Sequence, residues 1–176
     1  EGGGVYVYGS LSMSGGEISG NSAANNGGGV CAMGKLIMSG GTIGGTGEGK
    51  ANTAGDNGGG VCMFTSGMSS TSACIVSGNV TIIGNKKSSD GTANNVYLPS
   101  GKTITIGGAL TGGAQIGVTP SSWPTGTATK KIATQATDGD QNYVKSDDNA
   151  YEVKYDNGNL VLGLKGSNPQ PGNSQK

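Results

Sequence analysis

Short blocks in which apolar residues alternate with small polar ones recur along much of the chain. In the stretch Gly2–Asn21 these blocks are Val5–Val7, Leu11–Met13 and the neighbourhood of Ile18, with Gly-Ser or Gly-Gly between them. An alternation of period two is typical of a β-strand with one face in a core and does not fit an α-helix. Glycine suits the corners because it takes positive φ angles that other residues resist. The pattern therefore predicts three short strands in this stretch.

The same stretch returns later in the chain. It recurs as Gly27–Thr46, starts again as Gly58–Phe64, resumes as Cys74–Asn85, and has a degenerate fourth copy at Asn95–Gly108. The extra residues of the longer copies fall between the apolar blocks and leave the blocks intact, which is what a solenoid tolerates, since such insertions become loops. The loops expected from these insertions, which would present contacts, are residues 44–57, 64–73 and 85–94.

Three strands per copy with glycine corners describe one coil of a parallel β-helix, so we expect an all-β solenoid of about four coils. Equivalent residues of successive coils then stack as ladders about 4.8 Å apart and form the core. Asn21 and Asn85 each follow a glycine at a turn, where asparagine tolerates the left-handed backbone region. The predicted ladders are Val5/Val30/Val61/Val96, Val7/Ala32/Met63/Leu98, Leu11/Leu36/Cys74/Ile104, Met13/Met38/Val76/Ile106 and Ile18/Ile43/Ile82.

After residue 118 two prolines and the single tryptophan interrupt the alternation. Lys130–Gln135 is predicted to be a strand, and Tyr151–Leu164 a β-hairpin with a type I′ turn at Asn157–Gly158. The open end of a β-helix exposes core and backbone groups, so its last coil needs a cap. The expected domains are the β-helix repeats 1–118, a small C-terminal β cap 119–165 and a flexible Pro/Gly-rich tail or linker 166–176.

Composition and charge narrow the functional classes. The chain has 37 glycines among 176 residues, about three times the usual share, without a Gly-X-Y period. It has 11 basic residues, all of them lysine, 11 acidic residues and no histidine. The usual general base and the bidentate phosphate reader are therefore missing, and nucleic-acid binding is not expected. No apolar run approaches the ~18 residues of a membrane span, so the chain is not expected to cross a membrane.

The glycine corners and inward apolar positions of GGGVYV and GSLSMSGGEISGN carry a family resemblance. They are similar to the Gly-rich right-handed parallel β-helix repeats of bacterial surface proteins, which include large adhesins and the passenger domains of polymorphic outer-membrane proteins. The likeness covers roughly residues 1–118, although the Phe-x-x-Asn repeats of the outer-membrane type are not seen. It implies right-handed coiling and an exported, elongated, surface-displayed protein that works in adhesion or as a stalk. The chain opens in the middle of the pattern at Glu1, so we expect a piece of a longer polypeptide.

Two groups of residues are candidate sites. Asp138, Asp140 and Asn142 offer oxygen ligands at alternate positions, as a calcium loop does, but the Gly and Glu that complete an EF-hand are missing. The alternative is an acidic turn between cap strands, and Ca²⁺ is the only cofactor that the sequence suggests. Outward positions of the first strands are aromatic or apolar, which indicates either a contact surface or a face covered by a loop or the cap. These residues are Tyr6, Tyr8, Met33, Phe64 and Tyr97.

Three cysteines complete the candidate chemistry. Cys31 and Cys62 share the repeat position of Tyr6 and should be ladder neighbours, either as two free thiols or as a disulfide, although parallel in-register neighbours rarely suit a disulfide. Cys74 is expected to be a small core residue.

The sequence favours a non-catalytic protein. Glycoside hydrolysis needs two carboxylates at a set separation, and the acidic residues of the repeats occupy different coil positions. We therefore expect an extracellular structural or adhesive module of a bacterial surface protein, acting as an elongated scaffold or filament subunit. Its partners would be further copies, by head-to-tail or lateral β-stacking, or a host or cell-surface protein or glycan. The alternative is a carbohydrate-binding or polysaccharide-degrading β-helix, which a groove lined by aromatic residues and carboxylates would favour.

Overall fold

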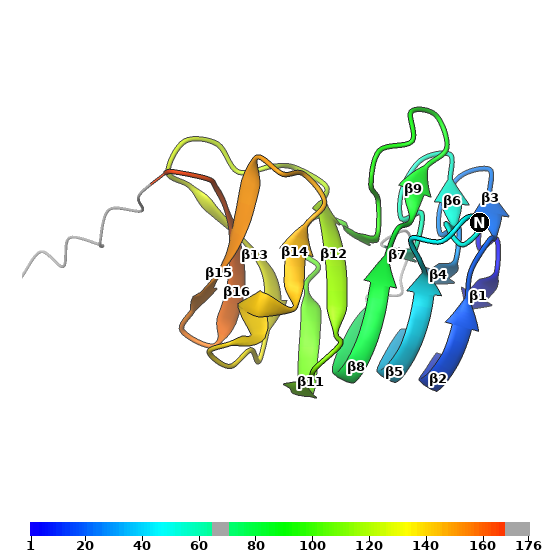
Figure 1. Cartoon of the computed structure of the whole chain (residues 1–176), viewed down its shortest axis with the longest axis horizontal. Coiled ribbons are helices and arrows are strands. Elements are labelled where there is room, and N and C mark those ends of the chain that lie inside the picture. The colour runs from blue at the N-terminus through cyan, green and yellow to red at the C-terminus, as the bar shows by residue number, and fades with distance from the viewer. Residues whose placement is uncertain (65–70, 168–176) are drawn as a thin grey trace, which may run out of the picture.

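The computed structural model describes residues 1–64 and 71–167, and this part of the chain is all-β apart from one 3₁₀ turn. Strands of successive repeats lie side by side and pair in parallel, in three rows along the long axis of the molecule (Figure 1). The first row is β1 (Val5–Val7), β4 (Val30–Ala32), β7 (Val61–Met63) and β10 (Val96–Leu98). The second is β2 (Ser10–Ile18), β5 (Lys35–Gly44), β8 (Ala73–Ile83) and β11 (Ile104–Leu110). The third is β3 (Ser22–Ala23), β6 (Thr53–Ala54) and β9 (Lys86–Lys87).

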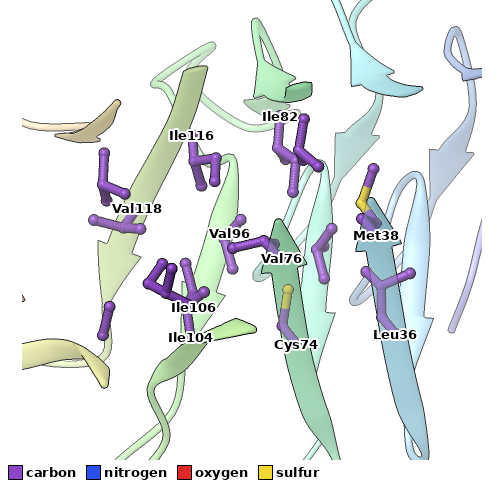
Figure 2. Close-up of a cluster of buried hydrophobic side chains, with 14 of the residues drawn as sticks. Leu36, Met38, Cys74, Val76, Ile82, Val96, Ile104, Ile106, Ile116 and Val118 are labelled. Carbon is purple, nitrogen blue, oxygen red and sulfur yellow. The ribbon is translucent and has the colours of Figure 1, made fainter. Parts of the chain in front are cut away.

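The pairing register confirms the predicted stacking of the repeats. Val30 lies between Val5 and Val61, and Val61 pairs in turn with Val96. The ladders that begin at Leu11, Met13 and Ile18 form in the same way. Figure 2 shows Leu36, Cys74 and Ile104 following one another across neighbouring strands. All predicted ladder residues are buried or pack against buried ones. The core therefore consists of stacked aliphatic, methionine and cysteine side chains and needs few aromatic residues.

The strand boundaries differ from the prediction in two respects. The second and third predicted strands of a repeat are one long strand that bends at a glycine with positive φ, which is 82° at Gly16 and 92° at Gly41. Glycine allows this bend without ending the parallel pairing. In addition, the expected loops 44–57 and 85–94 contain β6 and β9, so the third row was missed. Most of the expected loop 64–73 lies outside the described residues.

The C-terminal part extends the large sheet and makes it mixed. The first residues of β12 (Gln115–Pro120) pair with β8 and its last residues with β10. The hairpin of β15 (Tyr151–Asp156) and β16 (Asn159–Leu164) is antiparallel, as predicted. Its strand β16 also pairs with β13 (Thr129–Thr134), a contact that was not predicted from the sequence. The positive φ angles at Asn157 and Gly158, 43° and 81°, confirm the expected turn. The remaining elements are the 3₁₀ turn η1 (Asp140–Asn142) and β14 (Val144–Ser146), which pairs with β12.

The observed fold is therefore all-β with a large, mostly parallel sheet that is not closed, which is compatible with a β-helix. β12 crosses the predicted boundary at residue 118, because Val118–Pro120 pairs with Val96–Leu98. The division into 1–118, 119–165 and 166–176 stays a prediction, and the tail from residue 168 onward lies outside the described residues. No helix in the described ranges has the length and apolar character needed to cross a bilayer.

Candidate functional site

Four asparagines form a continuous hydrogen-bonded ladder along the repeats. The backbone N–H and the Nδ2 of Asn21 both donate to Oδ1 of Asn52, at 3.0 and 2.9 Å. Asn52 donates in the same way to Oδ1 of Asn85, at 3.2 and 2.9 Å, and Asn85 to Oδ1 of Asn95, at 2.9 and 3.0 Å. Spare Nδ2 hydrogens of Asn52 and Asn85 reach backbone carbonyls. The ladder therefore satisfies a line of polar groups that is buried beside the core.

The expected backbone role of Asn21 and Asn85 is wrong. Neither residue has a positive φ; the preceding Gly20 and Gly84 take it instead, at 69° and 73°. Glycine bears the left-handed conformation at lower cost, which leaves the asparagine free of a positive φ and its amide bonded along the stack. Two Gly-Asn pairs at equivalent repeat positions were the sequence signal for this ladder. Asn52 follows an alanine, so it offers no such signal.

The Gly-Gly-Gly-Val motif makes room for the ladder. A Cβ on Gly29 would lie 3.0 Å from Nδ2 of Asn52, and a Cβ on Gly60 would lie 2.6 Å from Nδ2 of Asn85. The third glycine of the motif is thus needed for a close approach between backbone and amide, and not only for a corner. A Cβ on Gly117 would similarly collide with the side chains at the end of the ladder.

Asp147, in the turn after β14, ends the ladder. The backbone N–H of Asn95 donates to its Oδ2 at 2.8 Å, and Nδ2 of Asn95 donates to its Oδ1 at 2.5 Å. The Thr119 hydroxyl donates to Oδ2 at 2.6 Å. Burial raises the pKa of the Asp147 carboxyl, and these three hydrogen bonds act against that rise. Asp147 was not singled out from the sequence, because nothing local places it beside Asn95.

A surface groove of about 630 Å³ opens beside Asp147. One wall is the loop after β9, with Asp90 and Thr92, and the other is made by the turns after β12 and β14, with Trp123 and Asn149. Figure 1 shows the loop rising above β9, with β12 and β14 to its left. Tyr97, Asn57, Lys87 and Asp148 also line the groove. A second hollow of about 640 Å³ shares Asp147, which therefore lies between the two.

Side chains of the groove are held in place by contacts within its walls. Oδ1 of Asp90 accepts hydrogen bonds from the Thr92 backbone N–H at 2.9 Å and hydroxyl at 2.7 Å, and the hydroxyl is the main cause that lowers the pKa of Asp90. The indole of Trp123 stacks on the ring of Tyr151, with centroids 4.6 Å apart and planes inclined by 26°. The groove is therefore largely preformed.

The predicted aromatic surface divides into two parts. Phe64 and Tyr97 line a hollow of about 220 Å³ that adjoins the groove through Tyr97. Tyr6 and Tyr8 lie at the other end of the row and are 48% and 81% exposed. The Tyr6 hydroxyl contacts the sulfur of Met33. An interaction role for these residues stays a prediction, but the structure joins Tyr97 to a polar site that the sequence pattern did not indicate.

The cysteines are structural in their surroundings. Cys31 and Cys62 pair in register, as predicted, and all three cysteines are free and buried. Burial raises the pKa of each thiol to about 12, so none is poised as a nucleophile at neutral pH. Cys74 lies in the core as expected.

Two of the proposed calcium ligands, Asp138 and Asp140, accept hydrogen bonds from other residues of the same turn. Oδ2 of Asp140 accepts from the Thr137 backbone N–H at 2.7 Å and hydroxyl at 2.9 Å. Oδ1 of Asp138 accepts from Nε2 of Gln141 at 3.0 Å, and Asn142 ends the 3₁₀ turn. Within residues 1–64 and 71–167 there is no group of three or more His, Cys, Asp or Glu side chains suited to a metal ion. Calcium binding stays a prediction. The observed hydrogen bonds are those of an acidic turn, the alternative given above.

The acidic residues of the repeats have different surroundings. Oε1 of Glu17 accepts from Nζ of Lys50 at 2.7 Å on the surface, and this hydrogen bond is the main cause that lowers the pKa of Glu17. Asp90, in contrast, joins Asp147 and Asp148 in one groove. The sequence pattern placed Asp90 in a loop of the repeats and placed Asp147 and Asp148 in the cap, so it did not predict that the three lie together.

Comparison of the chain with known protein families, with curated proteins and with solved structures finds no match.

Proposed function

We propose that the chain is a non-catalytic extracellular module of a bacterial surface protein, built as a right-handed parallel β-helix that acts as an elongated scaffold or filament subunit. The in-register stacking of the repeats is the observation that supports this proposal most directly. Each repeat contacts mainly its neighbours, so length grows by repetition and a rod with surface loops results. The resemblance of the Gly-rich repeats to bacterial surface proteins adds the extracellular location and the adhesive role.

The edge formed by the first repeat supports the filament role. Among the described residues, β1, β2 and β3 each pair on one side only. Such an edge offers unpaired N–H and C=O groups to a further strand. Oδ1 of Asn21 accepts no hydrogen bond from the described residues, whereas each following amide oxygen of the ladder accepts two. For the chain Glu1–Lys176 by itself, the partner we propose is a second copy that stacks on this edge in parallel; in a longer polypeptide a preceding repeat would take the same place.

Gly9 provides a specific test of stacking. Gly9 and Gly34 occupy the same position in consecutive repeats, and a Cβ on Gly34 would collide with the carbonyl oxygen of Gly9. A Cβ on Gly9 meets nothing within 4 Å, because no strand lies beyond it in the described chain. Gly9→Ala should therefore leave the fold intact and obstruct a copy that stacks in register. Gly112→Ala is the matched control, since a Cβ there also meets nothing within 4 Å and lies away from this edge.

The experiment is negative-stain electron microscopy with mass determination over a concentration series. The wild-type chain and Gly112→Ala should form elongated assemblies as concentration rises, while Gly9→Ala stays monomeric. Compact wild-type monomers at all concentrations would contradict the filament role and leave the single-rod scaffold. Equal assembly by Gly9→Ala would show that copies meet through another face.

A further inference from the structure

The groove beside Asp147 combines flat apolar surface with hydrogen-bonding side chains. Tyr97, in β10, and Trp123, in the turn after β12, both line this groove. Asn57, Asn149 and Asp90 add amide and carboxylate groups around them. Amides both donate and accept hydrogen bonds, while carboxylates only accept. Sugars present apolar C–H faces together with hydroxyls that donate and accept, so their chemistry matches this mixture.

The size and rigidity of the groove fit a small ligand. Its volume of about 630 Å³ falls within the usual range of ligand pockets. Trp123 is supported by Tyr151, and Asp90 is held by Thr92, so little ordering of side chains is needed on binding. Preformed side chains improve affinity because less conformational entropy is lost.

The strands under the groove argue against an extended peptide as the ligand. β10 pairs on one side with β7 and on the other with β12, so its backbone groups are already used. A peptide that adds a strand needs a free sheet edge, and β10 does not provide one.

The charge of the groove selects among sugars. Among the described residues that line it, Lys87 is the one basic side chain, while Asp90, Asp147 and Asp148 are acidic. An acidic uronate chain would meet repulsion here, whereas a neutral sugar would not. Asp147 is also turned to the ladder, since all three of its hydrogen bonds come from Asn95 and Thr119.

We propose that this groove binds a neutral oligosaccharide, with the rings of Tyr97 and Trp123 against the sugar and Asp90, Asn57 and Asn149 bonding its hydroxyls. The groove would then supply the adhesive contact of the module, and in this respect the inference rests on the proposed function. The two are tested separately, because saccharide binding is measured on dilute chain and end-to-end assembly on concentrated chain.

The single tryptophan makes the test direct, because Trp123 reports on the groove alone. The full chain is titrated with maltohexaose, cellohexaose, laminarihexaose, xylohexaose and mannohexaose, and with polygalacturonate as the anionic comparison. Trp fluorescence and calorimetry are both recorded. We expect at least one neutral hexasaccharide to change the fluorescence saturably, with a Kd of about 1 mM or tighter.

Variants assign the binding to the groove. Tyr97→Ala should weaken binding at least about tenfold, as expected for a central aromatic contact, and Asp90→Asn should weaken it to a smaller degree. Tyr8→Ala is the control, since Tyr8 is an exposed aromatic residue outside the groove, and it should bind as the wild type does. Circular dichroism and thermal unfolding show whether Tyr97→Ala is folded, and Asp90→Asn tests the site without removing packing.

Three outcomes would overturn the inference. The first is that no neutral hexasaccharide of the panel binds. The second is that Tyr97→Ala and Asp90→Asn, both folded, bind as tightly as the wild type. The third is that polygalacturonate binds more tightly than every neutral sugar.

Discussion

Asn95 donates two hydrogen bonds to the carboxyl group of Asp147. Its backbone N–H reaches Oδ2 at 2.8 Å, and its Nδ2 reaches Oδ1 at 2.5 Å. Along the rest of the ladder the same two donors converge on one amide oxygen of the next asparagine. The stack of amides therefore ends on a carboxyl group, which accepts the last N–H donors of the ladder. This contact joins the repeats to the turn that lines the groove.

Replacement of Asp147 should show whether its contribution to stability comes from accepting hydrogen bonds or from its negative charge. Asp147→Ala leaves two donors of Asn95 without their partner, and each unsatisfied buried group costs about 1–3 kcal/mol, so we expect unfolding to become easier by about 2 kcal/mol or more. Asp147→Asn retains an Oδ1 that accepts both donors, as the amides of Asn52, Asn85 and Asn95 do. Its stability at neutral pH should equal or exceed that of the wild type. Urea unfolding measures both variants; equal losses would show that the charge itself is needed.

Stability should depend on pH through Asp147. Its pKa is raised above the ordinary 3.8, so above pH 3.8 the folded protein keeps a proton that the unfolded chain has lost. The contribution of this group is complete below pH 3.8 and is lost as pH rises through the folded pKa. The stability of Asp147→Asn relative to wild type should therefore increase with pH across this window. The pKa values of Glu17 and Asp90 are lowered, so these groups contribute stability above their unfolded pKa values and lose it as pH falls. They are present in both the wild type and Asp147→Asn, so their contributions cancel when the two stabilities are subtracted. A pH-independent difference would contradict this assignment.

Equivalent glycines of two repeats should differ sharply in their tolerance of alanine. Gly34→Ala places a methyl group against the carbonyl of Gly9, which is backbone and has no easy way to move, so we expect a loss of about 3 kcal/mol or failure to fold. Gly9→Ala meets open space and should change stability by less than about 1 kcal/mol. Guanidinium unfolding of both variants checks this. Similar losses would mean that the position matters for backbone conformation and not for stacking distance.

The thiols should be inert until the protein unfolds. Cys31, Cys62 and Cys74 are buried, and their pKa values of about 12 leave little thiolate at mildly alkaline pH. Ellman's reagent should label none of them in the native chain and all three after denaturation. Rapid native labelling of one thiol, mapped by mass spectrometry, would show that the structure around that cysteine opens readily.

The apolar ladders could be predicted from the sequence because parallel stacking repeats one environment at one position. Leu36, Cys74 and Ile104 differ in size and chemistry, yet each stands at the same place between glycine corners. The hairpin at Tyr151–Leu164 was predictable for a similar reason, since Asn157–Gly158 specifies its turn locally. Period, corners and turn chemistry are properties of short segments.

The third row was not predictable in the same way. β6 and β9 are two-residue strands inside Gly-, Asn- and Ser-rich stretches, where no apolar alternation marks them. They are strands because each lies beside an equivalent segment of the neighbouring repeat. Asn52 joined the ladder for the same reason, through its neighbours in space.

By itself, then, the sequence determined the strand period, the inward residues and the stacking of the repeats, because hydrophobic alternation and glycine corners are encoded within each copy. Tertiary structure alone decided that Asp147 meets Asn95 and that Tyr97, Asp90 and Trp123 share one groove. These residues come from segments of different pattern, and only the return of the chain after β12 and β14 brings them together. Long-range contacts of this kind depend on how the whole backbone folds, and the repeat pattern of the sequence does not predict them.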